Sequence, residues 1–212
     1  LDVRETGVTD EAAEEFAALN KDLKLRFPGE TKMTDEGLKN LVRNRRSLET
    51  LDLYGTRVTD AGLKSLAGLE KLRTLKLDTT RVTGTGLKEA VGLRNLKRLS
   101  LRWTKVNDAG LKGLAELKTL TDLDLTDTKI TDAGLKELAG LQNLKYLTLE
   151  RTEVTGAGLK ELGGLPKLTF LDLERTKVTD AGLKEIAHLK KLEALVLKDT
   201  RVTNASLKAL AG

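Results

Sequence analysis

The sequence contains no cysteine, one histidine and two prolines in 212 residues, and aromatic residues make up only 3% of it. Without cysteine the chain can form neither disulfides nor thiolate metal sites, which favours a reducing, cytoplasmic location. No run approaches the roughly 18 consecutive apolar residues that a membrane helix needs. The charged opening LDVRETGVTD also lacks the apolar core of a signal peptide. These absences predict a chain without membrane segments.

The sequence also lacks a large excess of charge of either sign. The 37 lysines and arginines nearly balance 32 aspartates and glutamates, which leaves a net charge of +5. A surface that mixes both signs differs from the dense basic footprint of most nucleic-acid-binding domains. The composition therefore argues against nucleic acid as the main partner.

The sequence does contain a repeated motif. ITDAGLKELAGL at Ile130 returns as VTDAGLKSLAGL at Val58 and as VTDAGLKEIAHL at Val178. Its first residue recurs every 24 positions, and earlier copies at Val8 and Met33 each carry one extra residue. No linker interrupts the series. We therefore predict a single domain over residues 1–212, with about eight to nine repeats and without full polar caps at its ends.

Each repeat combines two periodicities. Alternation in Thr50–Tyr54 places Leu51 and Leu53 on one face of a short strand. In the segment that follows, apolar residues recur at helical spacing over about two turns, with Thr59 as N-cap. Gly62 in the first turn indicates close packing against the next repeat, and Gly68 suits a left-handed helix end. Such a unit cannot bury its leucines alone, so the copies are expected to stack with parallel strands.

The pattern LETLDLYGTRVTDAGLKSLAGL, from Leu48 to Leu69, resembles leucine-rich repeat proteins, and the resemblance covers essentially the whole chain. The second half is most similar to the cysteine-containing and GALA-like, ribonuclease-inhibitor-like subtypes, with Thr in place of their Cys or Asn. The resemblance implies an α/β solenoid, a right-handed horseshoe with parallel strands on the concave face and short helices on the convex face. We expect hydroxyls of the Thr column to bridge successive repeats. The column comprises Thr56, Thr80, Thr104, Thr128, Thr152, Thr176 and Thr200.

The sequence is poor in the parts of an active site. Its only histidine, His188, falls where other repeats have Gly or Glu at a helix exit, which predicts a surface cap rather than a base or ligand. Asp122 and Asp124 share one face of a strand, but no calcium-loop spacing accompanies them. The glycines fall at repeat positions and form no phosphate loop. We predict no enzyme activity, cofactor or metal site.

Residues that flank the strand leucines differ from repeat to repeat, as expected of a scaffold that carries a binding site. Tyr146 and Phe170 occupy one column in adjacent repeats, and exposed aromatics are enriched at binding hot spots. The columns are mildly basic toward the N-terminus and acidic from Asp122 onward, which suits a basic partner. The predicted site for a protein or peptide comprises Tyr146, Phe170, Asp122, Asp124, Glu150, Asp172, Glu174, Tyr54, Arg98 and Arg102.

Three alternatives remain open at this point. A basic rim, formed by Arg57, Arg81, Trp103, Lys105, Lys129, Lys177 and Arg201 and broken by Glu153, could bind a flexible polyanion or nucleic acid. The family resemblance also suggests the substrate-receptor part of a ubiquitin ligase, although nothing like the adaptor-binding domain of such receptors is present. The edge strands could pair with another copy, so the chain is expected to be a monomer or an end-to-end or edge-paired oligomer.

Overall fold

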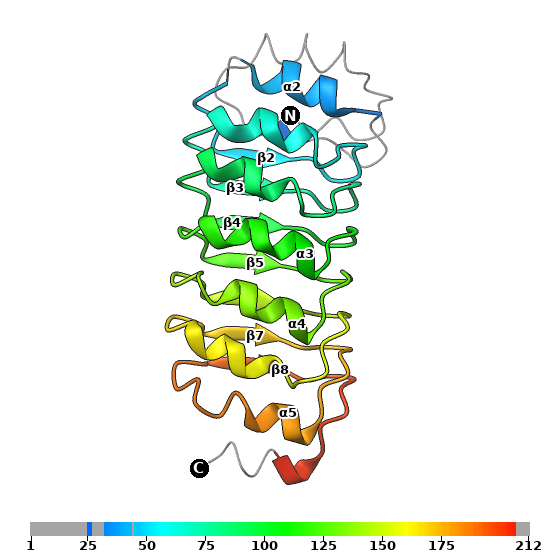
Figure 1. The fold of residues 1–212 in the computed structure, drawn as a ribbon, viewed down its shortest axis with the longest axis vertical. Coiled ribbons are helices and arrows are strands. Elements are labelled where there is room, and N and C mark those ends of the chain that lie inside the picture. Colours follow the sequence, from blue (N-terminus) through cyan, green and yellow to red (C-terminus); the bar gives the residue numbers. More distant parts are fainter. Residues whose placement is uncertain (1–24, 27–31, 44, 207–212) are drawn as a thin grey trace.

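A computed structural model describes residues 25–26, 32–43 and 45–206. Its strands form one sheet in chain order, β1 to β8, with every pair parallel. Figure 1 shows the strands stacked behind a column of short helices. The strands are β1 (Leu25–Arg26), β2 (Thr50–Asp52), β3 (Thr74–Lys76), β4 (Arg98–Ser100), β5 (Asp122–Asp124), β6 (Tyr146–Thr148), β7 (Phe170–Asp172) and β8 (Ala194–Val196).

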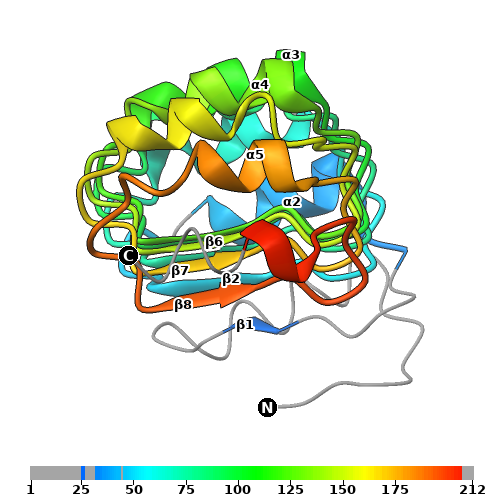
Figure 2. The same ribbon diagram turned by 90° about the horizontal axis from the view of Figure 1, so that it is seen from below.

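The register of the sheet repeats the register of the sequence. From β2 onward each leucine pairs with the leucine 24 residues later, as in Leu51 with Leu75 and Leu147 with Leu171. Seen along the stack, strands lie on one side and helices on the other, and the helices of the middle repeats project furthest outward (Figure 2). The helix side is therefore convex and the strand side concave, which confirms the predicted α/β solenoid.

Most helices are tighter than the two α-turns that the spacing predicted. Among the described residues, only α2 (Asp35–Val42) is an α-helix of eight residues. The others are η1 (Gly62–Gly68), η2 (Leu87–Gly92), α3 (Asp108–Leu111) with η3 (Lys112–Glu116), α4 (Asp132–Leu135) with η4 (Lys136–Leu138), η5 (Leu159–Gly164) and α5 (Asp180–Lys184), where η denotes a 3₁₀ helix. Strands repeat every ~4.8 Å, whereas packed α-helices need about 8–10 Å. Narrow 3₁₀ helices reduce that mismatch, and the convex curvature accommodates the rest.

The core is a column of leucines closed by threonines. Leu51, Leu53 and their equivalents through Leu173 are at most 2% exposed. The Thr column is also buried as far as Thr176, but its hydroxyls do not bridge repeats. The hydroxyl of Thr56 donates to the carbonyl of Leu53, 2.8 Å away in the same repeat, and Thr80 through Thr200 repeat this bond. The expected bridging was wrong because the turn after each strand offers a nearer acceptor. The carbonyl of Leu53 accepts both the amide of Thr56, at 3.2 Å, and its hydroxyl.

Two predictions about glycines also need correction. A Cβ on Gly62 would lie 2.4 Å from Oδ1 of Asp35, so the close contact is with the preceding repeat and not with the next one. Gly68 is not among the residues with positive φ, so it does not end its helix in the left-handed conformation. The left-handed position lies elsewhere, just after each strand, at Gly55 (φ 68°) and its equivalents.

This left-handed row was not foreseen from the sequence. Gly55 is followed at intervals of 24 by Thr79, Trp103, Asp127, Arg151, Arg175 and Asp199, whose φ values lie between 53° and 58°. The conformation aims each backbone N–H at the next repeat. Gly55 donates to the carbonyl of Asp78, and Trp103 to that of Thr126, both at 2.9 Å. The row therefore extends the sheet ladder beyond the strands, at the cost of a conformation that side chains disfavour.

Two kinds of contact join the helical sides of successive repeats. In what we call aspartate joints, a helix-start carboxylate accepts from the amide and hydroxyl of a Thr in the next repeat, as Asp35 does from Thr59 at 2.8 and 2.6 Å. Asp60, Asp108, Asp132 and Asp180 form the same joint.

The second kind, the glycine joint, occurs where Gly84 and Gly156 replace the aspartate. A Cβ on Gly84 would lie 2.8 Å from the Cα of Gly110, and one on Gly156 would lie 2.6 Å from the Cα of Gly182. Both glycines have positive φ, at 93° and 115°. The backbones of two repeats therefore touch directly, which only glycine allows.

Candidate partner-binding face

The candidate site lies on the concave face, where the strands hold side chains of neighbouring repeats side by side. Asp122 of β5 pairs in register with Tyr146 of β6, and Tyr146 pairs with Phe170 of β7. The rings of Tyr146 and Phe170 are 6.2 Å apart between centroids and tilted by 40°, within the range of favourable aromatic pairs. Tyr146 is nevertheless 48% exposed. The structure therefore brings the two aromatics together, with Tyr146 exposed and Phe170 partly buried.

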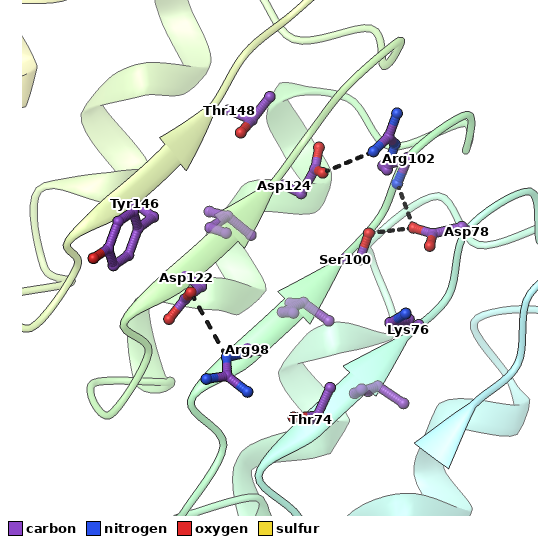
Figure 3. A pocket seen from close by; sticks show the side chains of 13 residues that line it. Thr74, Lys76, Asp78, Arg98, Ser100, Arg102, Asp122, Asp124, Tyr146 and Thr148 are labelled. Carbon is purple, nitrogen blue, oxygen red and sulfur yellow. Dashed lines mark hydrogen bonds and ion pairs between the residues drawn. The ribbon is translucent and has the colours of Figure 1, made fainter. Parts of the chain in front are cut away.

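Beside Tyr146 the concave face is hollowed over β3 to β6, with a volume of about 330 Å³ (Figure 3). Arg98 lies 3.7 Å from the carboxylate of Asp122, and Arg102 lies 3.6 Å from that of Asp124. The basic and acidic parts of the concave face, as predicted from the sequence, thus meet here. The arginines of the β4 repeat neutralise the aspartates of β5.

Further along, Glu174 contacts both Arg175 at 3.6 Å and Lys198 at 2.9 Å, and Glu150 contacts Arg175 at 3.7 Å. Arg175 belongs to the left-handed row, so the concave columns alone did not reveal this cation. Asp172, between these pairs, accepts from the amide of Glu174 at 2.8 Å. The predicted acidic floor is therefore neutralised in part.

Two carboxyl groups of the face are held in less favourable surroundings. Burial raises the pKa of Asp78, outweighing hydrogen bonds from the Ser100 hydroxyl and the Arg102 amide. Burial likewise raises the pKa of Asp172, and the nearby charges of Glu174 and Asp124 act in the same direction. A cation brought to this face would relieve both effects.

The remaining predicted residue, Tyr54, lies apart from this cluster. Tyr54 is 40% exposed but follows β2, four strands from β6, which is roughly 19 Å at ordinary strand spacing. Thr126, which shares its column, is buried and donates its hydroxyl to Asp124 at 2.6 Å. The sheet therefore places Tyr54 on the predicted face but outside the aromatic patch.

The basic rim is exposed along its length. Backbone hydrogen bonds to the preceding repeat fix its spacing, as from Arg57 to Met33 at 2.9 Å. Lys129 lies 3.7 Å from Glu153, so the residue that interrupts the row also neutralises a member. Trp103 is 47% exposed and carries the guanidinium of Arg102 at 4.5 Å from its ring centroid, a cation–π contact. Arg102 therefore lines the concave hollow and also contacts Trp103 of the rim.

His188 lies exposed on the helix side, where its ring covers Gly163 of the preceding repeat: a Cβ there would be 2.4 Å from Nε2. Within the described ranges, no group of three or more His, Asp or Glu side chains could hold a metal ion. In that same part of the chain, every helix is too short or too polar to span a bilayer.

Known proteins resemble this chain in both sequence and fold. A family profile described as "Leucine-rich repeat region" matches residues 1–179. The chain is a leucine-rich repeat protein. Members of this family are in general non-catalytic protein-interaction modules that use an extended concave surface. The match does not discriminate among subtypes, so the resemblance to the cysteine-containing and GALA-like repeats stays a prediction.

Two of the solved structures that resemble this chain are internalins from Listeria monocytogenes. Internalin C2 is 30% identical, with a TM-score of 0.68, and the match covers 96% of this chain and 80% of the internalin. Internalin InlF is 19% identical, with a TM-score of 0.63 over 94% of this chain and 67% of the other, a likeness of fold alone. No curated protein matches the sequence.

Proposed function

We propose that this leucine-rich repeat protein binds a protein or peptide on its concave face, at the patch formed by Tyr146 and Phe170. The observation that carries the proposal is the contact between Phe170 and the exposed Tyr146, which lines the hollow. Large exposed aromatics are enriched among hot-spot residues, and tight packing of Tyr146 against Phe170 holds the patch in one shape before binding.

The surroundings of the patch favour a partner segment with a basic side chain next to an apolar one. Asp172 lies two residues beyond Phe170 on the same face of β7, and burial and neighbouring carboxylates disfavour its ionised form. A lysine or arginine of the partner would offset that repulsion. Ala194 and Val196 of β8 continue the apolar surface on the far side of Phe170, so an aliphatic side chain could pack there.

The test is a peptide-display selection on the immobilised chain, followed by affinity measurements with the selected peptides. Peptides that pair an aromatic or aliphatic residue with Lys or Arg are expected. The double variant Tyr146→Ala, Phe170→Ala should weaken binding by more than ~2 kcal/mol, roughly 30-fold. Tyr54→Ala is the matched control, since Tyr54 is a similarly exposed aromatic on the same face, and it should leave affinity unchanged.

Two outcomes would count against the proposal. If the double variant binds as tightly as the wild type, the patch is not the site. If the selected ligands are acidic and their binding falls steeply with salt, the basic rim with Trp103 is the better candidate.

A further inference from the structure

A second hollow, of about 480 Å³, lies on the opposite, convex side between α2 and η1, near the top of Figure 1. Its lining includes Glu36, Lys39, Arg43, Arg46, Ser65 and Gly68. It lies on the helix face and shares no lining residue with the concave hollow.

The hollow lies at an irregular repeat. The copy that begins at Met33 is one residue longer than the regular ones, and α2 is the longest α-helix in the described part of the chain. At the end of η2, a Cβ on Gly92 would lie 1.9 Å from the carbonyl oxygen of Ala67, so successive helix ends touch. At the equivalent Gly68, nothing lies within 4 Å of that position. The ends of η1 and η2 therefore pack tightly against each other, whereas the ends of α2 and η1 are separated.

The lining carries a surplus of positive charge. Lys39 is bound to Glu36 at 3.1 Å. Arg43 and Arg46 are exposed, and neither forms an ion pair within the described part of the chain. Two guanidinium groups beside one hollow therefore keep their full hydrogen-bonding capacity. An Arg fork matches the oxygen atoms of phosphate or carboxylate in a bidentate manner.

We propose that this hollow binds a phosphate monoester, carried by a phosphorylated side chain of a partner protein, with Arg43 and Arg46 as its donors. Three cations and one carboxylate leave two positive charges, which match the −1.5 to −2 of a phosphate monoester near pH 7 better than a single carboxylate. The volume exceeds that of the anion alone and leaves room for the side chain that bears it. Inorganic phosphate supplies the same chemistry without the partner, so the experiment separates the two sources.

The experiment titrates the full ¹⁵N-labelled chain with a Gly-Gly-phosphoserine-Gly-Gly peptide, its unphosphorylated form, a Glu-substituted form and inorganic phosphate. Amide shifts confined to α2 and η1 are expected with the phosphopeptide. It should bind at least tenfold more tightly than each of the other three. Equal binding of the Glu peptide or of inorganic phosphate would overturn the assignment to a phosphorylated side chain.

Two site variants remove the site in different ways. Arg43→Gln with Arg46→Gln removes the charge, and Gly68→Met fills the hollow while every charge stays. Each should weaken phosphopeptide binding at least tenfold. The matched controls are Arg81→Gln with Arg94→Gln, two exposed arginines elsewhere, and Gly140→Met, where a Cβ would have only one contact at 3.6 Å.

Both controls should bind as the wild type does. A loss in the arginine control equal to that in the site variant would mean diffuse electrostatic attraction and would overturn the proposal. The Tyr146→Ala, Phe170→Ala variant should keep full phosphopeptide affinity. This inference therefore stands or falls independently of the proposed concave site.

Discussion

The carboxylate of Asp60 accepts hydrogen bonds from the amide and the hydroxyl of Thr83, at 3.0 and 2.6 Å, across the boundary between two repeats. The same carboxylate also accepts from the amides of Gly84 and Gly86, at 3.0 and 2.9 Å. Gly84 can aim its amide inward because it has a positive φ. One side chain thus satisfies three backbone donors of the following repeat.

Replacement of Asp60 by alanine should therefore lower the free energy of unfolding by about 2 kcal/mol, because a charged acceptor of several hydrogen bonds is lost. Urea denaturation at pH 7 measures the effect. Glu49→Ala is the control: Glu49 lies 3.9 Å from Arg73 in an exposed ion pair, which contributes at most about 1 kcal/mol. Equal losses in the two variants would contradict the role given to Asp60.

The aspartate joints also predict how stability depends on pH. Burial alone would raise the pKa of Asp60 and Asp132, but hydrogen bonds from the next repeat outweigh it and hold both pKa values below the ordinary range. A folded-state pKa below the unfolded value of about 3.9 gives stabilisation that is complete above the unfolded value and is lost as pH falls through the folded-state pKa. Asp60→Asn with Asp132→Asn should therefore cost more stability at pH 7 than at pH 3, as measured by urea denaturation.

For Asp78 the dependence of stability on pH has the opposite sign. Burial raises the pKa of its carboxyl group, so above the unfolded pKa the ionised carboxylate lowers the stability of the folded chain. Asp78→Asn should cost little stability at pH 7, because an amide oxygen can still accept from Arg102. A loss at pH 7 as large as that of the Asp60 and Asp132 variant would contradict this account.

The glycine joints should not tolerate a side chain. Gly84→Ala places a methyl group 2.8 Å from the Cα of Gly110, at a φ of 93° that side chains rarely adopt. We expect a loss of more than ~2 kcal/mol from overpacking and backbone strain together. Thermal denaturation of Gly84→Ala beside Gly68→Ala tests this, since the space at Gly68 is open. The Gly68 variant should stay within about 0.5 kcal/mol of the wild type.

The left-handed row allows a reciprocal exchange. Thr79 has φ 58° although it is β-branched, whereas Gly55 occupies the equivalent position at φ 68°. Gly55→Thr should destabilise the chain by about 1–2 kcal/mol, the ordinary cost of a side chain in this conformation. Thr79→Gly should stabilise it, by up to about 1 kcal/mol once the greater freedom of unfolded glycine is subtracted. Chemical denaturation of both variants should give opposite signs, and equal signs would exclude backbone strain as the cause.

Sequence periodicity predicted the sheet, its register and the concave columns, because a strict 24-residue repeat admits one way to stack its leucines. The contact of Tyr146 with Phe170 followed from that register. The left-handed row did not, because only Gly55 in it is a glycine, and Trp103 or Arg175 gives no local signal of positive φ. Ion pairs such as Arg175 with Glu174 were missed for the same reason, since they join that row to a concave column.

The convex hollow shows another limit of pattern reading. One extra residue after Met33 was visible in the sequence, but the opening beside Gly68 depends on how far α2 diverges from η1. Likewise, the position of Asp60 near a helix start does not reveal that its carboxylate binds the next repeat. Contacts between repeats depend on three-dimensional offsets that periodicity alone does not fix.

From Asp35 to Asp180 the joints run Asp35, Asp60, Gly84, Asp108, Asp132, Gly156 and Asp180, so that two aspartate joints precede each glycine joint. Carboxylates therefore couple three consecutive repeats, and the coupling changes in kind at Gly84 and Gly156. In a nearest-neighbour description of a solenoid, the interfaces between repeats set the size of the unit that opens together. If the aspartate joints couple repeats more strongly than the glycine joints do, a block of three repeats should open as one unit, and fraying should advance block by block rather than strand by strand.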